Sequence, residues 1–314
     1  MSLLERFNNK DRRALSRLIS YVENREENYR TVLSKIFPQT GHAYKIGLTG
    51  PPGAGKSTLV DSITELLVNN GNKVGIIAVD PSSPFTGGAF LGDRIRMQDR
   101  ALNEAVFIRS MATRGSSGGL AQATRDVSMV FDAFGFDYIL IETVGVGQVE
   151  LDIIDASDTV IVTIVPESGD IIQAMKAGLM EIADIFCLNK ADREGADRII
   201  TELNHLLHIS RSKSDWKFPV IATQAVHKKG IDLLIKTIAQ HAEFVRESGL
   251  FKKRRKQQIK NDIIAYIRQM LSANIEKKLQ SAESYDSILE DIYERKADPI
   301  STAQDIFKRH YSNL

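Results

Sequence analysis

Short apolar runs alternate with longer amphipathic stretches through the middle of the chain. The runs are rich in β-branched residues and apolar at nearly every position, which is typical of strands buried on both faces of a parallel sheet. The stretches between them repeat their apolar residues at helical spacing and would form right-handed crossovers. The pattern predicts an α/β fold with a mostly parallel sheet flanked by helices. Its strands are expected near residues 43–48, 74–79, 105–111, 137–141, 159–165, 182–188 and 218–222.

Helical periodicity without such runs marks both flanks of this region. Leu15, Leu18 and Val22 share one helical face near the N-terminus, and Ile263 and Ile267 share another near the C-terminus. An arm with an apolar stripe often packs against a second copy of itself, so we expect a homodimer through this arm. The expected parts are an N-terminal helical extension over 1–42, an α/β domain over 43–249 and a C-terminal helical dimerisation arm over 250–314.

The composition changes this picture little. The 314 residues are 43% hydrophobic and 26% charged, which is ordinary for a globular protein. A net charge of +1 gives no global attraction to nucleic acid or membranes, and no apolar run is long enough to span a bilayer. The basic run at 252–256 is expected to be a solvated helix face. The single cysteine, Cys187, excludes an internal disulfide and is expected to be a buried thiol, so we expect a cytoplasmic protein.

The clearest chemistry lies in the stretch 50–57, which reads GPPGAGKS. It fits the pattern of a phosphate-binding loop and lies between an apolar run and a helical one. Glycines let backbone N–H groups point at phosphate oxygens, and the N-terminus of the following helix favours anions. Lys56 would reach the β- and γ-phosphates, and the Ser57 hydroxyl would bind Mg²⁺. The predicted nucleoside triphosphate site contains Gly50, Pro51, Pro52, Gly53, Ala54, Gly55, Lys56 and Ser57.

Acidic residues end two of the predicted strands. In a parallel sheet ligands bind beyond the C-terminal strand ends, so a carboxylate at Asp80 can reach a magnesium ion held by phosphate. The long loop that follows carries Asp93 and Arg96, which a loop movement would bring to the site; the alternative is a solvated loop with scattered charges. Glu142 ends another strand, where P-loop proteins place an acidic residue near the metal or the attacking water. Gly145 would offer an amide to the γ-phosphate.

The stretch Asn189-Lys190-Ala191-Asp192 predicts the base. It follows a strand and fits the Asn-Lys-x-Asp element of GTPases. The Asp192 carboxylate would accept hydrogens from guanine N1 and the exocyclic amine. Adenine offers neither donor in that place and would leave the carboxylate unpaired, which is costly. Lys190 would cover the base, and Asn189 would join neighbouring loops.

A last loop, Thr223-Gln224-Ala225, follows the final predicted strand. GTPases place a Ser-Ala pair here, whose backbone N–H meets guanine O6. This chain has Gln224 in place of the serine, which puts the bracing of the loop in doubt. The amide of Ala225 is expected to keep the contact with O6.

Together these motifs resemble the MeaB, methylmalonic aciduria type A and ArgK family of P-loop GTPases. The resemblance spans residues 46–192 in the family's order, and the long segment that begins VDPSSP is far more specific than the phosphate loop. Members of this family are GTPases that assist cobalamin-dependent acyl-CoA mutases. The matching segments are GLTGPPGAGKSTL, VDPSSPFTGGAFLGDRIRM, MATRGSSGGLA, ETVGVGQVE, PESGDIIQAMKAGLMEIAD and NKAD.

The resemblance implies a GTP-hydrolysing chaperone that gates cofactor loading, protection or reactivation of a mutase. The partner would be methylmalonyl-CoA mutase or a related enzyme, which itself binds the cobalamin. Segments 80–97 and 142–148 would be switches, and 166–178 a third switch in which Gln173 and Lys176 answer to the mutase. Phosphate contacts would extend to Thr58. The metal residues would be Ser57, Asp80, Asp93 and Glu142, and the catalytic residues Lys56, Glu142, Asp93 and Arg96.

Three other functions remain open from the sequence. A metallochaperone GTPase for a nickel enzyme would need a histidine tract or clustered cysteines, whereas this chain has six scattered histidines and one cysteine. A protein kinase acting on an amino-acid-transport binding protein would need to meet such a partner. A nucleotide-gated scaffold would bind GTP with negligible hydrolysis.

Overall fold

The computed structural model describes residues 1–80, 103–112, 117–143, 153–167, 179–210, 215–280 and 285–311. The chain divides into two units, Met1–Ile259 and Lys260–Leu314. The first unit contains the predicted sheet and the segments that follow its strands. The second contains the end of one long helix and two shorter helices.

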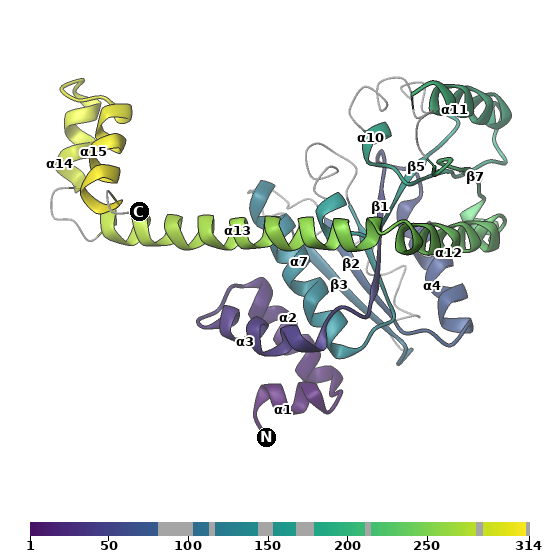
Figure 1. The fold of residues 1–314 in the computed structure, drawn as a ribbon, viewed down its shortest axis with the longest axis horizontal. Helices are drawn as coiled ribbons and strands as arrows, with labels where there is room; N and C mark the ends of the chain where they lie inside the picture. Colours follow the sequence, from purple (N-terminus) through teal and green to yellow (C-terminus); the bar gives the residue numbers. More distant parts are fainter. Residues whose placement is uncertain are drawn as a thin grey trace. The chain divides into compact units, whose positions relative to one another are not determined.

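A parallel sheet forms the centre of the first unit (Figure 1). The strand order is β3-β2-β4-β1-β5-β6-β7, and every neighbouring pair among the described strands is parallel. This arrangement confirms the predicted α/β fold. The strands are β1 (Tyr44–Thr49), β2 (Val74–Asp80), β3 (Val106–Ala112), β4 (Tyr138–Glu142), β5 (Thr159–Ile164), β6 (Ile185–Leu188) and β7 (Val220–Ala222).

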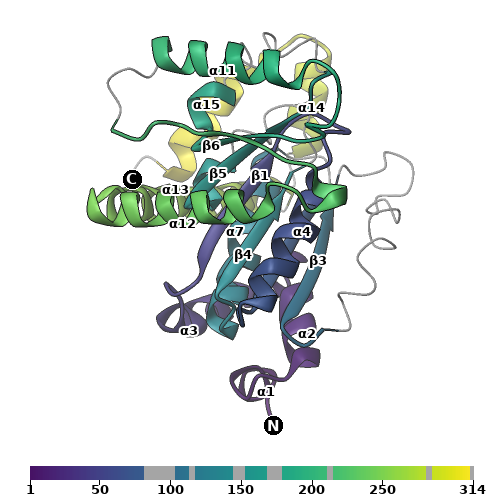
Figure 2. The same ribbon diagram turned by 90° about the vertical axis from the view of Figure 1, so that its right-hand side faces the viewer.

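Helices cover both faces of the sheet, which explains why the strands are apolar at nearly every position. Ile161 of β5 faces a core shared with α4 (Lys56–Asn69) and α12 (Ile231–Glu247). Figure 2 shows α4 lying across the strands on this face. The neighbouring Val160 faces the opposite side, where α11 (Ala196–Ser210) packs. Further along that side lies α7 (Ser117–Phe134), whose Phe131 is fully buried.

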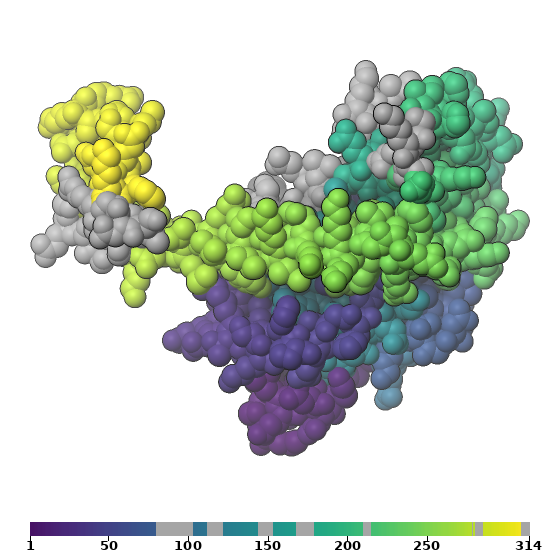
Figure 3. All heavy atoms as spheres, viewed as in Figure 1, coloured from purple at the N-terminus to yellow at the C-terminus, as the bar shows by residue number. Residues whose placement is uncertain are grey.

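The N-terminal extension packs on the outside of α7. Leu15, Leu18 and Val22 are fully buried in the same core as Phe131, so the extension shares the core of the first unit. Its helices appear in purple in Figure 3. They are α1 (Leu3–Asn8), α2 (Arg12–Glu23), α3 (Tyr29–Ile36) and the single turn η1 (Phe37–Gln39).

The helix α13 (Leu250–Gln280) begins in the first unit and ends in the second. The basic run near its start is a solvated face only in part: Lys252, Lys253 and Lys256 are exposed, as expected, whereas Arg254 and Arg255 are partly buried. Arg254 and Arg255 form ion pairs with Asp184 and Asp158, whose side chains are 5% and 1% exposed. The reason is that both carboxylates are buried at the starts of neighbouring strands, where they need cationic partners. Two further helices, α14 (Tyr285–Tyr293) and α15 (Pro299–Tyr311), follow.

Apolar residues of α13 face solvent beyond the first unit. Ile263 is 55% exposed, Ile267 47% and Met270 47%. Within the described part of the chain, no helix combines the length and the apolar character needed to cross a membrane.

Candidate nucleotide-binding site

The phosphate loop connects β1 to α4 and requires glycine at two positions. Gly50 has φ of 137°, and a Cβ there would lie 2.0 Å from the carbonyl oxygen of Thr163 in β5. Gly55 has φ of 87°, and a Cβ there would lie 2.4 Å from Nδ2 of Asn189. Any larger side chain would therefore strain the loop and push it away from its neighbours.

The predicted lysine and serine open α4. The Lys56 ammonium donates to the carbonyl oxygens of Gly50 at 2.8 Å and Pro51 at 3.1 Å, so it lies over the phosphate loop. The Ser57 hydroxyl donates to Oε1 of Glu142 at 2.6 Å. This contact forms because β4 pairs with β1, with Glu142 opposite Leu48. The fold thus brings together residues separated by 85 positions, as the sequence predicts.

The oxygen donors of Ser57 and Glu142 suit a magnesium ion, which prefers hydroxyl, carboxylate and phosphate oxygens. Asp80 is the last residue of β2, a direct neighbour of β4. Asp93, Arg96 and Gly145 lie outside the described residues, as does most of the proposed third switch, positions 168–178. Among the side chains that the structure describes, no group of three or more His, Cys, Asp or Glu residues could hold a metal ion. The magnesium site therefore stays a prediction.

The predicted base-selecting element is tied to the phosphate loop. Asn189 follows β6 and donates from Nδ2 to the carbonyl oxygen of Ala54 at 2.9 Å. Lys190 donates to the carbonyl oxygen of Gly53 at 2.8 Å. Asp192 is exposed, so its carboxylate is open to a ligand. Two loops far apart in the sequence therefore form one surface at the C-terminal edge of the sheet.

The last base loop contains a contact that the sequence did not predict. The backbone N–H of Ala225 donates to Oδ1 of Asn189 at 3.1 Å, and the Thr223 hydroxyl donates to the same oxygen at 3.2 Å. The amide expected to meet guanine O6 therefore already has an acceptor. The sequence could not show this, because the Asn189 side chain reaches it from another loop. A contact with O6 would require the Ala225 amide to change partners.

Backbone pairing braces this loop in place of the missing serine. Gln224 and Lys229 exchange two backbone hydrogen bonds, of 3.0 and 3.2 Å. The Ser62 hydroxyl of α4 donates to the carbonyl oxygen of Ala225 at 3.0 Å. The loop that contains Gln224 is thus supported by Lys229 on one side and by Ser62 on the other. Sequence reasoning missed Ser62, because a serine inside a helix gives no motif.

Cys187 is a buried thiol, as predicted. Burial raises its pKa to about 12, and its Sγ lies 3.2 Å from the Thr223 hydroxyl. The thiol therefore stays protonated at neutral pH and supports Thr223, which in turn contacts Asn189.

Comparison with known proteins identifies the family of this chain. The family described as methylmalonyl Co-A mutase-associated GTPase MeaB matches residues 15–282. The chain belongs to the MeaB family. It is 50% identical over 309 residues to a candidate GTPase of Pyrococcus abyssi, covering 98% of this chain and 95% of that one. It is 35% identical over 292 residues to GTPase ArgK of Escherichia coli, covering 90% of this chain and 87% of that one.

A solved structure is similar over almost the whole MeaB-family chain. It is the crystal structure of a LAO/AO transport system kinase, with a TM-score of 0.71 and 28% identity. The match covers 98% of this chain and 95% of the other. The phosphate loop, Glu142 and Asn189–Asp192 all lie within the segment that the MeaB family matches.

Proposed function

We propose that this MeaB-family chain hydrolyses GTP and uses the nucleotide state to assist a cobalamin-dependent acyl-CoA mutase. The client is methylmalonyl-CoA mutase or a related enzyme. One observation carries the nucleotide part of the proposal: the phosphate loop, the Ser57–Glu142 pair and the base-selecting element converge at one edge of the sheet. The family description, which names a mutase-associated GTPase, supports the client.

The residues at this edge have separable roles. Lys56 would exchange its two carbonyl acceptors for phosphate oxygens, which are stronger acceptors because they are charged. Ser57 and Glu142, with Asp80 and Asp93, would hold Mg²⁺, which stabilises negative charge on the transferring phosphoryl group. Glu142 also fixes the direction of the Ser57 hydroxyl. Asp192 would accept from guanine, and Asn189 would keep the base loop against the phosphate loop.

The nucleotide state would reach the mutase through the predicted switches. Contacts to the γ-phosphate would hold these segments in one arrangement, and the mutase would bind that arrangement. Gln173 and Lys176 are the proposed contacts in the third switch, and Arg96 is a proposed cation for the transition state. The mutase, not this chain, would bind the cobalamin.

A titration tests the function directly. The rate of phosphate release from GTP should rise as methylmalonyl-CoA mutase is added to the full chain. Lys56→Ala should abolish the release with or without mutase, which shows that this site does the work. GTP turnover that is absent in the wild-type chain would favour the scaffold function. Turnover that is unchanged across the titration would contradict the choice of client.

The similar solved structure, named a transport system kinase, makes phosphate transfer to a protein the second candidate. Both functions use the same nucleotide site, so only the acceptor distinguishes them. Labelled γ-phosphate should appear as inorganic phosphate for a GTPase. Label on a transport binding protein would favour the kinase.

We also propose that the chain is a homodimer through residues 250–314. The exposed Ile263 and Ile267 lie one helical turn apart on α13 and would be covered by the second copy. Ile263→Glu should shift sedimentation toward the monomer. Lys260→Glu, a charge change on the same helix, should not. A dimer that survives Ile263→Glu unchanged would move the interface elsewhere.

A further inference from the structure

Three buried carboxylates and two arginines gather at the edge of the sheet opposite the nucleotide site. They lie around the N-terminal end of β1, the strand that leads into the phosphate loop. We call this cluster the strand-entrance hub, and it consists of Asp132, Asp158, Asp184, Arg254 and Arg255. Both arginines belong to the first turns of α13, residues 250–258, which we call the root of that helix.

The pair of Asp158 and Arg255 joins β1, β5 and α13. Two hydrogen bonds link the side chains, from Nε at 2.7 Å and from Nη2 at 2.6 Å. Asp158 also accepts from the backbone N–H of Lys45 at 2.9 Å, and Arg255 donates to the carbonyl oxygen of Ala43 at 3.0 Å. One carboxylate and one guanidinium thus fix the start of two neighbouring strands to the helix.

The pair of Asp184 and Arg254 repeats this arrangement at β6. The guanidinium donates to both carboxylate oxygens, at 2.7 and 3.0 Å, and to the carbonyl oxygen of Asp158 at 2.9 Å. Asp184 accepts as well from the backbone N–H of Val160 at 2.9 Å. His241 of α12 lies 3.3 Å from the same carboxylate and hydrogen-bonds the Thr159 hydroxyl at 2.7 Å. The hub therefore includes the starts of β5 and β6.

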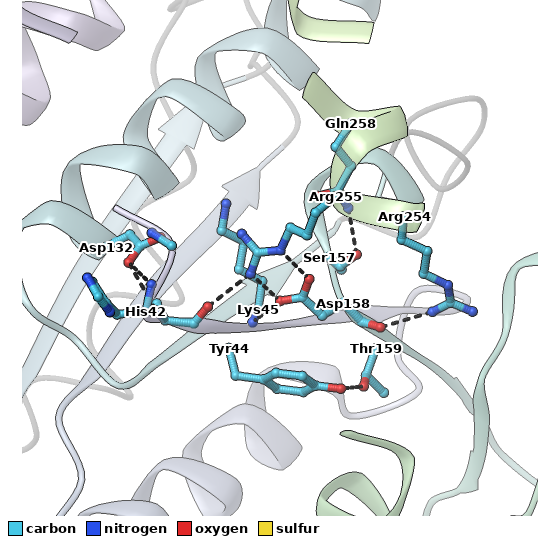
Figure 4. A network of polar contacts seen from close by, with 12 residues as sticks. His42, Tyr44, Lys45, Asp132, Ser157, Asp158, Thr159, Arg254, Arg255 and Gln258 are labelled. Atoms are coloured by element: carbon cyan, nitrogen blue, oxygen red, sulfur yellow. Dashed lines mark hydrogen bonds and ion pairs between the residues drawn. The ribbon is translucent and has the colours of Figure 1, made fainter. Parts of the chain in front are cut away.

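Asp132 of α7 completes the hub on the other side of β1. Its carboxylate accepts from three consecutive backbone N–H groups, those of Gly41, His42 and Ala43, at 2.8 to 3.0 Å. These residues form the connection between the N-terminal extension and β1. The start of β1 is thus held by carboxylates from α7 and β5 and by an arginine from α13 (Figure 4).

The same strands carry the nucleotide site at their other ends. β1 leads into the phosphate loop, β6 leads into Asn189, and β5 supplies the Thr163 carbonyl that lies against Gly50. A six-residue strand is only about 20 Å long, and its hydrogen-bonded neighbours move with it. We propose that the hub couples the root of α13 to the nucleotide site. Nucleotide binding then tightens the root, and loss of the hub weakens nucleotide binding.

The use of charged partners in the hub favours a role in coupling the root to the nucleotide site over a role in only attaching the root to the sheet. Replacing a buried ion pair by apolar residues is often neutral or stabilising, so such pairs are poor devices for stability alone. Bidentate arginine–carboxylate pairs instead fix one geometry, because both hydrogen bonds are lost when the groups turn. If the root is held in one geometry, a shift of the strands also shifts the root. The helix α13 continues from the root past residue 259.

Hydrogen exchange on the full chain tests the coupling without any substitution. The inference rests on the proposed guanine-nucleotide site, so GDP binding is confirmed first by calorimetry. Saturating GDP should then slow exchange of the amides in residues 251–258 by about 5-fold or more. Unchanged exchange in the root, with GDP bound, would overturn the coupling. Failure of the chain to bind GDP would instead overturn the proposed function.

A pair of variants tests the reverse direction. Arg255→Met should weaken GDP binding by about 5-fold or more, since coupling between two sites is reciprocal. The control is Arg109→Met, because Arg109 pairs with Glu23 at a similar exposure, 23% against 20% for Arg255, but lies on the edge strand β3. The control should leave the affinity within about 2-fold.

Equal GDP affinity in wild type and Arg255→Met would show that the hub only holds the root to the sheet, and it would contradict the proposal. If Arg255→Met does not fold, Arg254→Met takes its place, with the same expected loss and the same contradicting result. The exchange experiment on the wild-type chain decides the question independently of both variants.

Discussion

The two edges of the sheet hold their cations in different ways. At the C-terminal edge, Lys56 and Lys190 donate to backbone carbonyls of the phosphate loop. At the N-terminal edge, Arg254 and Arg255 are paired bidentately with buried carboxylates. Neutral carbonyls are weaker acceptors than charged groups, so Lys56 can exchange them for phosphate, whereas the arginines have no better partner to move to.

This difference separates a site built for exchange from one built for fixed geometry. At the nucleotide edge, polar groups can exchange their present partners for a ligand. At the hub edge, each charged group stays paired with its present partner. Substitutions at the two edges should therefore fail in different ways. The hub should lose stability, and the nucleotide edge should lose turnover or affinity while the fold persists.

The largest expected effect is at the hub. Arg255→Met should lower the free energy of unfolding by about 3–5 kcal/mol, because Asp158 would be left charged and buried without its partner. The exposed Arg198, paired with Glu202 on α11, provides the control, and Arg198→Met should leave the unfolding curve essentially unchanged. Urea denaturation measures both. Similar curves for the two variants would show that the buried pair contributes no more to stability than a surface pair.

Lys56→Ala should show the opposite behaviour at the nucleotide edge. Loss of this cation should lower kcat for GTP by about 100-fold or more, as for other preorganised groups that stabilise transition-state charge. The free energy of unfolding should change by only about 0.5–1.5 kcal/mol per lost hydrogen bond, since the carbonyl acceptors are neutral. Phosphate release and urea denaturation on the same sample provide both numbers. A variant that unfolds but keeps its turnover when folded would reverse the comparison.

Asp192→Asn should alter base choice without touching the hub. The wild-type carboxylate would accept two hydrogen bonds from guanine, so the variant should bind GDP about 10- to 100-fold more weakly. Glu194→Gln, which also removes one negative charge close by, is the matched control and should bind normally. Calorimetry with GDP measures the change. Normal GDP affinity in Asp192→Asn would remove the basis for guanine selection.

Acid should weaken the hub. Burial alone would raise the pKa of Asp184, but hydrogen bonds from His241 and Arg254 outweigh it and hold the pKa below its ordinary value. A lowered folded-state pKa contributes stability that is complete above the unfolded value of about 3.9 and is lost as pH falls through the folded one. The stability difference between wild type and Asp184→Asn should therefore shrink as the pH falls below about 4. Urea denaturation at a series of pH values measures this, and a difference that grows in acid would contradict the assignment.

The smallest effect is expected at Gln224. Gln224→Ser restores the residue usual in GTPases, but two backbone hydrogen bonds to Lys229 already brace the loop. GDP affinity should stay within about 2-fold of the wild type, as is usual for substitutions away from buried features. A larger gain would show that the glutamine does weaken the base contact.

The sequence predicted the nucleotide edge far better than the hub. The phosphate loop and Asn189–Asp192 are short motifs with fixed spacing, and parallel strands bring their ends together. Asp158 and Arg255 are separated by 97 positions, and neither belongs to a motif. A run such as 252–256 has the composition of a solvated face, and only the fold shows that its two arginines pair with buried carboxylates. The Ala225 contact was likewise hidden, because it depends on the side-chain direction of Asn189.

Competition between purines tests the central claim most directly. Calorimetric titration of the full chain, with Mg²⁺ present, should show saturable binding of GDP at one site. ADP should bind at least about 100-fold more weakly, because its base cannot satisfy the Asp192 carboxylate. Equal affinity for GDP and ADP would contradict the account of this edge as a guanine-nucleotide site.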